Sequence, residues 1–434
     1  MAALLLALVL ALGALAAGCG GSDESAEPAA PAPAPAEPAP AEPAPAEPAP
    51  AEPAPAEPAP AEPAPAETGP APTGEPITIG LAIALSGPIN FYDGPIEKAA
   101  QVAVDEINAA GGVLGRPLEL ISADMASDPA KSGAAAQELI DKGAEALILP
   151  ADFDMGQGAA RVASENNLIS IQSAGSELSG VEGLGPLHYN IYAGTASEGA
   201  AVAQYAVDNG WKNVFLLEDP TLAYDTDLCK FFGEALETYG GTIAGKDTFQ
   251  NDDPSIANQI SAMQSASPDA VMVCSYLPGA AAAIKQIRDV TDIPVLTGIG
   301  QDGTFWLEGI PGASGIYIST LGSILGDDSE PQVNDFMAAY QAGTGEPAPH
   351  SLSILGYQMV KMLAHGFEGA GTTEGDKVAA VLDTVTDLDI AGTKFTYTPT
   401  CHKTPRPMTV MQIQDGTLSF AAKPEPASIP DSKC

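Results

Sequence analysis

Basic residues are scarce in this chain of 434 residues, in which 17 Lys and Arg stand against 56 Asp and Glu for a formal net charge of −39 at pH 7. The first 76 residues contain no Lys, Arg or His at all. A surface of this charge repels the phosphate backbone of nucleic acids and the headgroups of anionic lipids. We therefore expect no nucleic-acid partner and no polybasic membrane-binding surface.

Long apolar runs are also missing, apart from one at the start of the chain, Leu4 to Ala17, which has the length of a secretory signal core. It ends in Leu15-Ala-Ala-Gly-Cys19, which resembles the bacterial lipobox, where cleavage precedes a cysteine that is then acylated. We expect residues 1–18 to be a lipoprotein signal peptide and Cys19 to anchor the protein to a membrane. The alternative is an ordinary signal peptide with a chance cysteine, since the usual basic segment before the run is absent.

Six consecutive Ala-Glu-Pro-Ala-Pro units occupy residues 36–65. Proline removes amide donors and fixes φ, so this tract cannot build a sheet or an interior helix and is expected to adopt extended polyproline II structure. We interpret residues 19–76 as a lipid anchor followed by a disordered Ala/Glu/Pro spacer.

Cysteine is rare, and beyond Cys19 the chain has only four: Cys229, Cys274, Cys401 and Cys434. An even number in an exported protein permits two disulfides, with three possible pairings. We favour a bond between Cys401 and Cys434, because it would hold the C-terminal tail. No C-x-x-C spacing typical of a metal site is present.

The rest of the chain alternates apolar runs typical of buried strands with segments of helical periodicity. Pro95, Asp128-Pro129 and Asp253-Pro254 have the residue types that begin helices, and Gly111-Gly112 is typical of a helix end. This βα series predicts an α/β fold of two halves, each a parallel sheet with helices on both faces. Predicted strands cover residues 77–85, 118–121, 146–149, 168–171, 213–217, 242–249, 270–273, 293–296 and 315–318, and further helices cover 197–207, 225–239, 333–341 and 352–367.

Several strings in this body are specific enough to indicate a family. They are Ile77-Thr-Ile-Gly-Leu, Leu85-Ser-Gly-Pro88, Ala103-Val-Asp-Glu-Ile-Asn-Ala-Ala-Gly-Gly-Val-Leu-Gly-Arg-Pro-Leu118 and Ser127-Asp-Pro-Ala130. Over about residues 77–414 the chain resembles type I periplasmic (solute) binding proteins of the Leu/Ile/Val-binding family. The resemblance implies two Rossmann-like lobes with parallel sheets, joined by three crossovers and closing on a ligand. Lobe 1 would comprise residues 77–194 and 322–392, and lobe 2 residues 195–321 and 393–434.

The residues give little support to an enzyme. Gly111-Gly112-Val-Leu-Gly115 follows a helix and precedes a strand, which is the wrong order for a phosphate-binding loop. Gly175-Ser176-Glu177 does not complete the G-x-S-x-G motif of a nucleophile elbow. Four widely separated histidines show no paired ligand spacing: His188, His350, His365 and His402. We expect no catalytic residues, no cofactor and no metal.

The resemblance places ligand contacts in the loops that follow the strands of both lobes. The candidates are Phe91, Tyr92, Asp152, Phe153, Asp154, Ser173, Ala174 and Ser176 in lobe 1, and Thr195, Tyr224, Tyr276 and Asp302 in lobe 2. Each aromatic side chain could instead hold its own loop by packing.

Departures from the family pattern bear on the ligand. Asp152 and Asp154 occupy the loop where the amino-acid binders typically place a serine for the ligand carboxylate, whereas Asp302 matches the acid that commonly takes an ammonium group. Carboxylates near a ligand carboxylate would be repulsive in a partly desolvated cleft. We predict a preference for a neutral or cationic ligand over aliphatic L-amino acids. In the alternatives, the aspartates cap a helix, or Ser173 and Ser176 hold the carboxylate.

We therefore expect an extracytoplasmic, membrane-anchored lipoprotein that binds a small polar solute of the branched-chain amino acid or amide type in an interlobe cleft. Its partners would be the permease and the ATPase of an ABC importer. The alternative is a sensory lipoprotein that presents its ligand to a membrane receptor.

Overall fold

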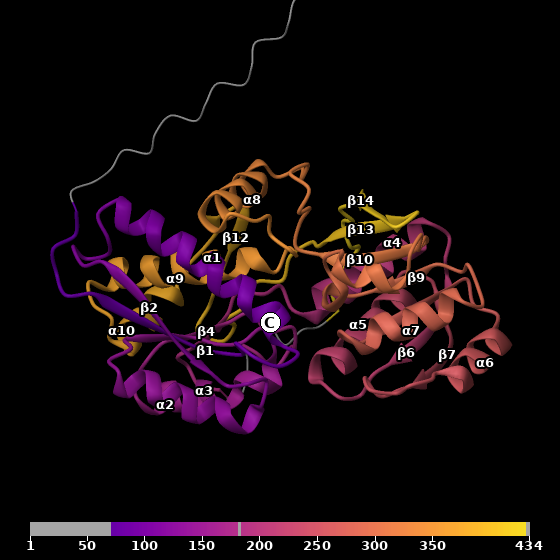
Figure 1. The fold of residues 1–434 in the computed structure, drawn as a ribbon, viewed down its shortest axis with the longest axis horizontal. Helices are drawn as coiled ribbons and strands as arrows, with labels where there is room; N and C mark the ends of the chain where they lie inside the picture. The colour runs from indigo at the N-terminus through magenta and orange to yellow at the C-terminus, as the bar shows by residue number, and fades with distance from the viewer. Residues whose placement is uncertain (1–70, 181–183, 431–434) are drawn as a thin grey trace, which may run out of the picture. The chain divides into compact units, whose positions relative to one another are not determined.

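The computed structural model describes residues 71–180 and 184–430. The predicted signal peptide, the lipid attachment at Cys19 and the repeat at residues 36–65 lie outside the described residues, as does Cys434. Within the described residues, helices cover two large sheets, so the α/β fold predicted from the alternating pattern is confirmed (Figure 1).

The first sheet consists of five parallel strands: β1 (Ile77–Ile83), β2 (Leu118–Asp124), β3 (Ala146–Ile148), β4 (Ser170–Gln172) and β5 (His188–Asn190). Their order across the sheet is β2-β1-β3-β4-β5. Strand β1 is buried along almost its whole length, which explains its continuous apolar sequence. The pattern predicts four of the five strands, and the short His-Tyr-Asn sequence of β5 carries no apolar signal.

Six helices surround this sheet: α1 (Asn90–Ala109), α2 (Ser132–Asp141), α3 (Phe153–Glu165), α8 (Pro331–Thr344), α9 (Ser353–Ala370) and α10 (Gly375–Leu382). In Figure 1, α2 and α3 lie together on one face, and α1 and α9 lie on the other. Helix α1 packs along α9, although more than two hundred residues separate them in the sequence.

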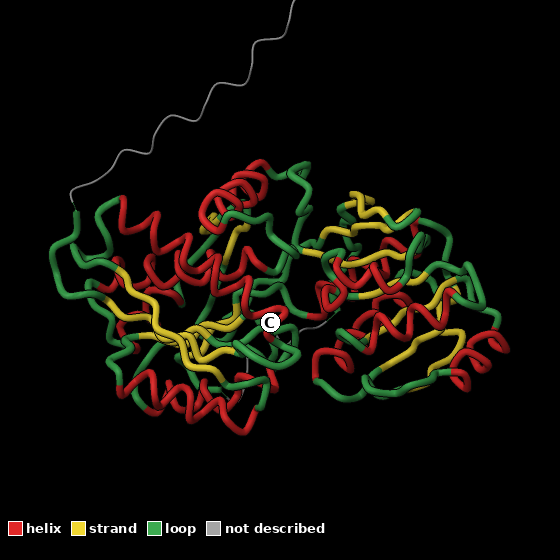
Figure 2. The backbone as a smooth tube through the Cα atoms, in the orientation of Figure 1, coloured by secondary structure: helices red, strands yellow, loops and turns green. Residues whose placement is uncertain are grey.

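The second sheet has seven strands: β6 (Asn213–Glu218), β7 (Thr242–Thr248), β8 (Ala270–Cys274), β9 (Val295–Thr297), β10 (Ile316–Thr320), β13 (Thr409–Gln414) and β14 (Thr417–Ala422). Their order is β14-β13-β10-β9-β8-β6-β7; the strands are parallel except that β13 runs antiparallel to both of its neighbours, β10 and β14. Figure 2 shows these strands in yellow among red helices. The helices are α4 (Thr195–Asp208), α5 (Ala223–Thr238), α6 (Ala257–Ala266) and α7 (Gly279–Arg288).

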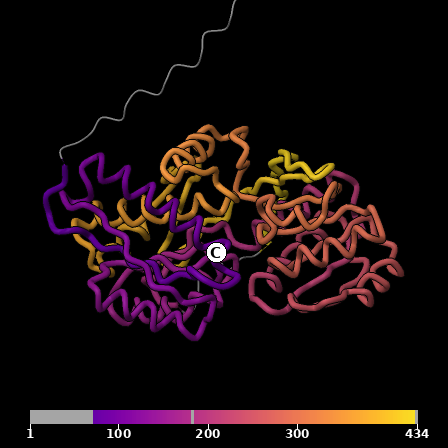
Figure 3. The backbone as a smooth tube through the Cα atoms, viewed as in Figure 1, coloured from indigo at the N-terminus to yellow at the C-terminus, as the bar shows by residue number. Residues whose placement is uncertain are grey.

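The chain passes between the two sheets three times, which Figure 3 allows the reader to follow by colour. It leaves the first sheet after β5, returns after β10 to place α8 and α9 beside α1, and crosses again to add β13 and β14. A hairpin, β11 (Leu388–Ile390) and β12 (Thr393–Phe395), precedes the last crossing. The expected lobe ranges, 77–194 with 322–392 and 195–321 with 393–434, remain our proposal for the division.

The predicted helix start at Pro95 is wrong. Helix α1 begins at Asn90, and Pro95 lies inside it. Because proline has no N–H, it leaves the carbonyl of Phe91, four residues earlier, without its helical partner. His350 lies with its Nε2 atom 3.1 Å from that carbonyl oxygen and replaces the missing donor. A contact between residues 259 positions apart explains why this helix tolerates its proline.

Two predicted caps had opposite outcomes. Asp128 caps as predicted, because its side chain accepts a hydrogen bond from the Ala130 N–H at 3.0 Å and opens the short helix η1 (Pro129–Lys131). Asp253 does not begin a helix, since it accepts from the N–H of Gln250 at 2.8 Å and closes a turn. Helix α6 begins only at Ala257.

One disulfide joins Cys229 in α5 to Cys274 at the end of β8, with a Cα–Cα distance of 5.6 Å. This bond ties the helix to the sheet that it covers. Cys401 is itself disulfide-bonded. Its predicted pairing with Cys434 involves a residue outside the described part of the chain and stays a prediction.

Candidate ligand-binding site

A cavity of about 50 Å³ lies beyond the carboxyl ends of strands from both sheets. Parallel sheets bring these ends to one edge, where α/β proteins commonly bind their ligands. The wall is built by α1, by loops after β3, β4, β5, β8 and β9, and by the start of α5. Its residues are Ile89, Tyr92, Ala151, Asp152, Ser173, Gly175, Tyr192, Leu222, Tyr224, Tyr276, Ile299, Gly300 and Leu352.

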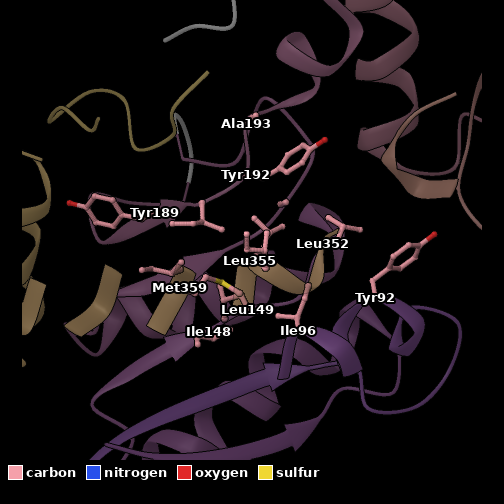
Figure 4. Packing of buried hydrophobic residues seen from close by; sticks show 14 of the residues in the cluster. Tyr92, Ile96, Ile148, Leu149, Tyr189, Tyr192, Ala193, Leu352, Leu355 and Met359 are labelled. Carbon is pink, nitrogen blue, oxygen red and sulfur yellow. The ribbon is translucent and has the colours of Figure 1, made fainter. Parts of the chain in front are cut away.

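Four tyrosines form much of this wall: Tyr92, Tyr192, Tyr224 and Tyr276. The Tyr92 hydroxyl donates to the carbonyl oxygen of Gly300 at 2.8 Å and accepts from the N–H of Leu277 at 3.3 Å. It therefore links α1 to two loops that follow strands of the second sheet. In Figure 4 the hydroxyls of Tyr92 and Tyr192 project toward the same side, away from the apolar core around Leu149 and Met359.

The buried carboxylate of Glu198 bonds to the hydroxyls of two of these tyrosines. It accepts hydrogen bonds from the hydroxyls of Tyr192 at 2.7 Å and Tyr224 at 3.0 Å, and from the N–H of Ile299. Burial raises the pKa of the Glu198 carboxyl to about 7 despite these three donors. A β-carbon at Gly298 would overlap the Tyr224 hydroxyl and the Glu198 carboxylate, so the group requires glycine there.

Asp152 lines the cavity and also caps α3, because its carboxylate accepts from the N–H of Met155 at 3.0 Å. Burial, together with the smaller effect of the charge of Asp154, raises the pKa of Asp152 to about 7. Asp154 itself accepts from the N–H of Ala223 at 2.8 Å, at the start of α5. Capping, which was the alternative to ligand contact, is thus a structural role of Asp152, and the residue also belongs to the cavity wall.

Two polar side chains of this region have no hydrogen-bond partner among the described residues. Ser173 lines the cavity and is 2 % exposed, and its hydroxyl is unpaired. Both carboxylate oxygens of Asp225, next to Tyr224 in α5, are unpaired, and the residue is completely buried. A buried polar group without a partner is costly, so such groups are expected where a ligand binds.

Five of the twelve predicted ligand-binding residues lie on the wall: Tyr92, Asp152, Ser173, Tyr224 and Tyr276. Seven lie off it: Phe91, Phe153, Asp154, Ala174, Ser176, Thr195 and Asp302. Phe91 stacks on Phe305, with ring centroids 3.9 Å apart, at the start of the short helix η3 (Phe305–Gly309). Phe153 and Ala174 are buried in the core of the first sheet.

The remaining polar residues of the prediction bond to protein groups. The Ser176 hydroxyl donates to Asp227 at 2.8 Å. Asp302 accepts from the N–H of Ser351 at 2.6 Å, and also from its hydroxyl, so this carboxylate holds the loop before α9. Thr195 begins α4 and is fully buried. The structure brings only Asp152 and Ser173 to the cavity from the expected set of carboxylates and hydroxyls.

Sequence reasoning missed Tyr192, Glu198 and Asp225. Glu198 and Asp225 occupy first turns of helices, where acidic residues are common for electrostatic reasons, so their type and position gave no sign of function. The one available signal was the adjacency of Asp225 to a predicted contact, Tyr224.

Among the described residues, no helix is both long and apolar enough to span a membrane. In the same part of the chain, no group of three or more His, Cys, Asp or Glu is arranged to hold a metal ion.

The sequence model of one protein family, described as periplasmic binding protein, matches residues 76–417. The match covers most of the chain and, apart from β14, both sheets with their helices. This protein belongs to the periplasmic binding protein family.

Relatives of this periplasmic binding protein include a Leu/Ile/Val-binding protein of Rhizobium johnstonii, 26% identical over 350 residues, which are 80% of this chain and 94% of the relative. A Leu/Ile/Val-binding protein homologue of Brucella melitensis is 25% identical over 350 residues, 79% of this chain and 92% of its own length. Both are named for binding, so this periplasmic binding protein has relatives that are binding proteins and not enzymes.

Solved structures show the same fold. A leucine binding protein of Thermotoga maritima superposes with a TM-score of 0.71 at 23% identity, covering 80% of this chain and 98% of the other. A branched-chain amino acid transporter substrate binding protein of Streptococcus pneumoniae, crystallised with isoleucine, gives a TM-score of 0.71 at 24% identity, over 80% and 99% of the two chains. The two-lobed fold with three crossovers is therefore that of the periplasmic binding proteins.

Proposed function

We propose that this protein is an extracytoplasmic substrate-binding lipoprotein of an ABC importer, which encloses a small polar solute between its two lobes and delivers it to a permease. The observation that carries the proposal is the cavity, whose wall comes from strand ends of both sheets and includes the unpaired hydroxyl of Ser173. The names of the relatives support a solute of the amino-acid class.

A cavity of this construction suits reversible capture of a ligand. The Tyr92 hydroxyl bonds across to Gly300 and Leu277, and Asp154 bonds across to Ala223. These contacts join the two sheets on either side of the cavity and can form only when the lobes are closed. Closure therefore buries the ligand and creates hydrogen bonds at the same time.

The direct test is to purify the protein without denaturation, denature it, and identify any released small molecule by mass spectrometry. Isothermal titration of the emptied protein with leucine, isoleucine, valine and small amides then gives affinities. We expect Ser173→Ala to weaken binding by about tenfold, because a buried polar contact to the ligand is lost. Ser261→Ala, on the exposed face of α6, serves as the matched control. A protein that carries and binds no solute contradicts the proposal.

The lipid anchor is tested separately through Cys19. We expect a Cys19→Ala protein to be released from membranes or to remain unprocessed, while its ligand affinity is unchanged. An intact mass that shows an unmodified residue 19 in the wild-type protein would exclude the anchor. Uptake of labelled ligand by cells, compared with the response of a receptor, separates transport from sensing.

A further inference from the structure

Asp225 is the most unusual acid in the molecule's binding region. It is the third residue of α5, immediately after Tyr224, whose ring forms part of the cavity wall. Its side chain is completely buried, and no described residue donates a hydrogen bond to either carboxylate oxygen. An ionised carboxylate in this state loses its hydration and gains no protein donor in return.

The charged neighbours of Asp225 add to the energetic cost of its ionised form. The side-chain charges that act on it most strongly belong to four acids: Asp219, Asp152, Glu218 and Glu198. Glu218 is neutralised by Lys246 at 2.7 Å, and Asp219 accepts from the hydroxyl of Ser275 at 3.0 Å. Asp152 caps α3 and Glu198 accepts from two tyrosines. Asp225 alone among these five acids has no bonding partner in the described structure.

Asp225 does not itself line the cavity, but it follows Tyr224 directly and lies close to the aromatic part of the wall. Its charge acts on the hydroxyls of Tyr92, Tyr224 and Tyr276, all of which line the cavity. The charge of Asp152, from the opposite sheet, acts on Tyr92, Tyr276 and Asp225. Carboxylates and tyrosine faces both attract positive charge, and each does so more strongly when water is excluded.

We propose that the ligand of this cleft is a small organic cation whose ammonium or amidinium group is neutralised by Asp225 and Asp152 within the wall of Tyr92, Tyr224 and Tyr276. The inference rests on the proposed solute-binding function and names the substrate class of the same cavity. The free hydroxyl of Ser173 is available to the other end of the ligand. The cavity of about 50 Å³ favours a compact molecule.

The test is isothermal titration of the full chain with three probes of similar size and different charge: n-butylamine, butyramide and butyrate. Leucine is the fourth probe. We expect butylamine to bind at least about tenfold more tightly than butyramide, because a desolvated charge pair contributes more than a neutral contact, and butyrate to bind most weakly. Asp225→Asn keeps the shape and removes the charge. It should weaken butylamine binding by about tenfold or more and leave butyramide within about twofold.

Glu234→Gln, an equal change of charge on the exposed face of α5, should leave all affinities unchanged. Circular dichroism reports whether each variant folds, and Tyr276→Ala replaces Asp225→Asn if the latter does not. Equal binding of butylamine by the wild type and Asp225→Asn overturns the inference, as does tighter binding of leucine or butyrate than of butylamine. In the leucine case the proposed function still stands.

The remaining outcome is a protein that binds none of the four probes. The net charge of the small molecule released on denaturation then decides whether the ligand is a cation. A released cation supports the inference, and a released zwitterion, neutral compound or anion overturns it. If no molecule is released, both the inference and the proposed function fail.

Discussion

Glu177 and Lys403 form a buried ion pair, although they are separated by 226 residues. The Lys403 side chain is fully buried, and the Glu177 carboxylate also accepts from the N–H of Ala196 at 2.7 Å, in the first turn of α4. The pair therefore connects the start of α4 with the last crossing between the sheets, where two chain segments run from one lobe to the other.

We predict that Lys403→Met lowers the free energy of unfolding by about 3–5 kcal/mol, because it leaves the Glu177 carboxylate buried without its countercharge. Adding Glu177→Gln should recover a large part of this loss, since the uncompensated charge is then gone. Urea unfolding of the two single variants and the double variant measures the coupling. Strictly additive effects would contradict the interpretation.

The hydrogen bond from His350 to the carbonyl of Phe91 gives a second prediction. His350→Ala should cost about 1–3 kcal/mol of stability for the unpaired buried carbonyl, besides the cost of the cavity it leaves. Pro95→Ala restores an N–H that can donate to Phe91. The cost of His350→Ala should therefore be smaller in the Pro95→Ala background, as measured by urea unfolding. Equal costs in both backgrounds would show that this contact adds no stability.

The third prediction concerns the disulfide between Cys229 and Cys274, which are 45 residues apart. Closing a loop of this length restricts the unfolded chain and stabilises the folded state by about 4 kcal/mol on the chain-entropy model. We expect the double variant Cys229→Ala with Cys274→Ala to lose stability of about this size. It should also weaken ligand binding, since the bond ties α5, which carries Tyr224, to β8, which precedes Tyr276. Thermal unfolding and titration check both effects.

The fourth prediction is a dependence of stability on pH that comes from Asp225. Burial and neighbouring acids raise the pKa of Asp225 well above its ordinary value of 3.8, so the folded state binds its proton more tightly than the unfolded state does. The stability from this group is fully present below the unfolded pKa and is lost as pH rises through the folded pKa. Other titratable groups face Asp225 from the surrounding elements: Asp152, Glu198, Glu218, Asp219, Tyr92, Tyr224 and Tyr276.

Asp225→Asn should accordingly stabilise the ligand-free protein at pH 8, because the amide carries no charge that has to be buried. At pH 4 the difference from the wild type should be much smaller. Urea unfolding at both pH values decides, with Glu234→Gln as the control that should show no such pH dependence. A variant that is less stable than the wild type at pH 8 would indicate a donor to Asp225.

The fifth prediction concerns the Ala/Glu/Pro repeat. Deleting residues 36–65 should leave ligand affinity unchanged within about a factor of two, because so few apolar side chains cannot offset the entropy of ordering the tract. Transport could still suffer if the tract sets the reach of the protein from the membrane. A large loss of affinity in titration would place the tract in the binding site.

Local sequence patterns predicted most of the fold but not all of its elements. Continuous apolar runs identified strands such as β1 and β8, because a strand that is buried on both faces has apolar residues at consecutive positions. The start of α3 was interpreted as a ligand-binding loop, with helix capping by Asp152 and Asp154 given as the alternative. Strands β5, β11 and β12 were missed because their residues form no continuous apolar run, and β13 and β14 were missed as well.

The sequence by itself determined the alternation of strands and helices and the family resemblance. It also placed Tyr92, Asp152, Ser173, Tyr224 and Tyr276 near the carboxyl ends of the strands, where they meet. These features depend on residues close together in the chain. Only the tertiary structure decided which polar groups were left without partners, as at Asp225, and which were paired across 226 or 259 residues, as at Lys403 and His350. The physical reason is that the cost of burying a polar group depends on the donors and acceptors that packing brings to it, and those come from distant segments.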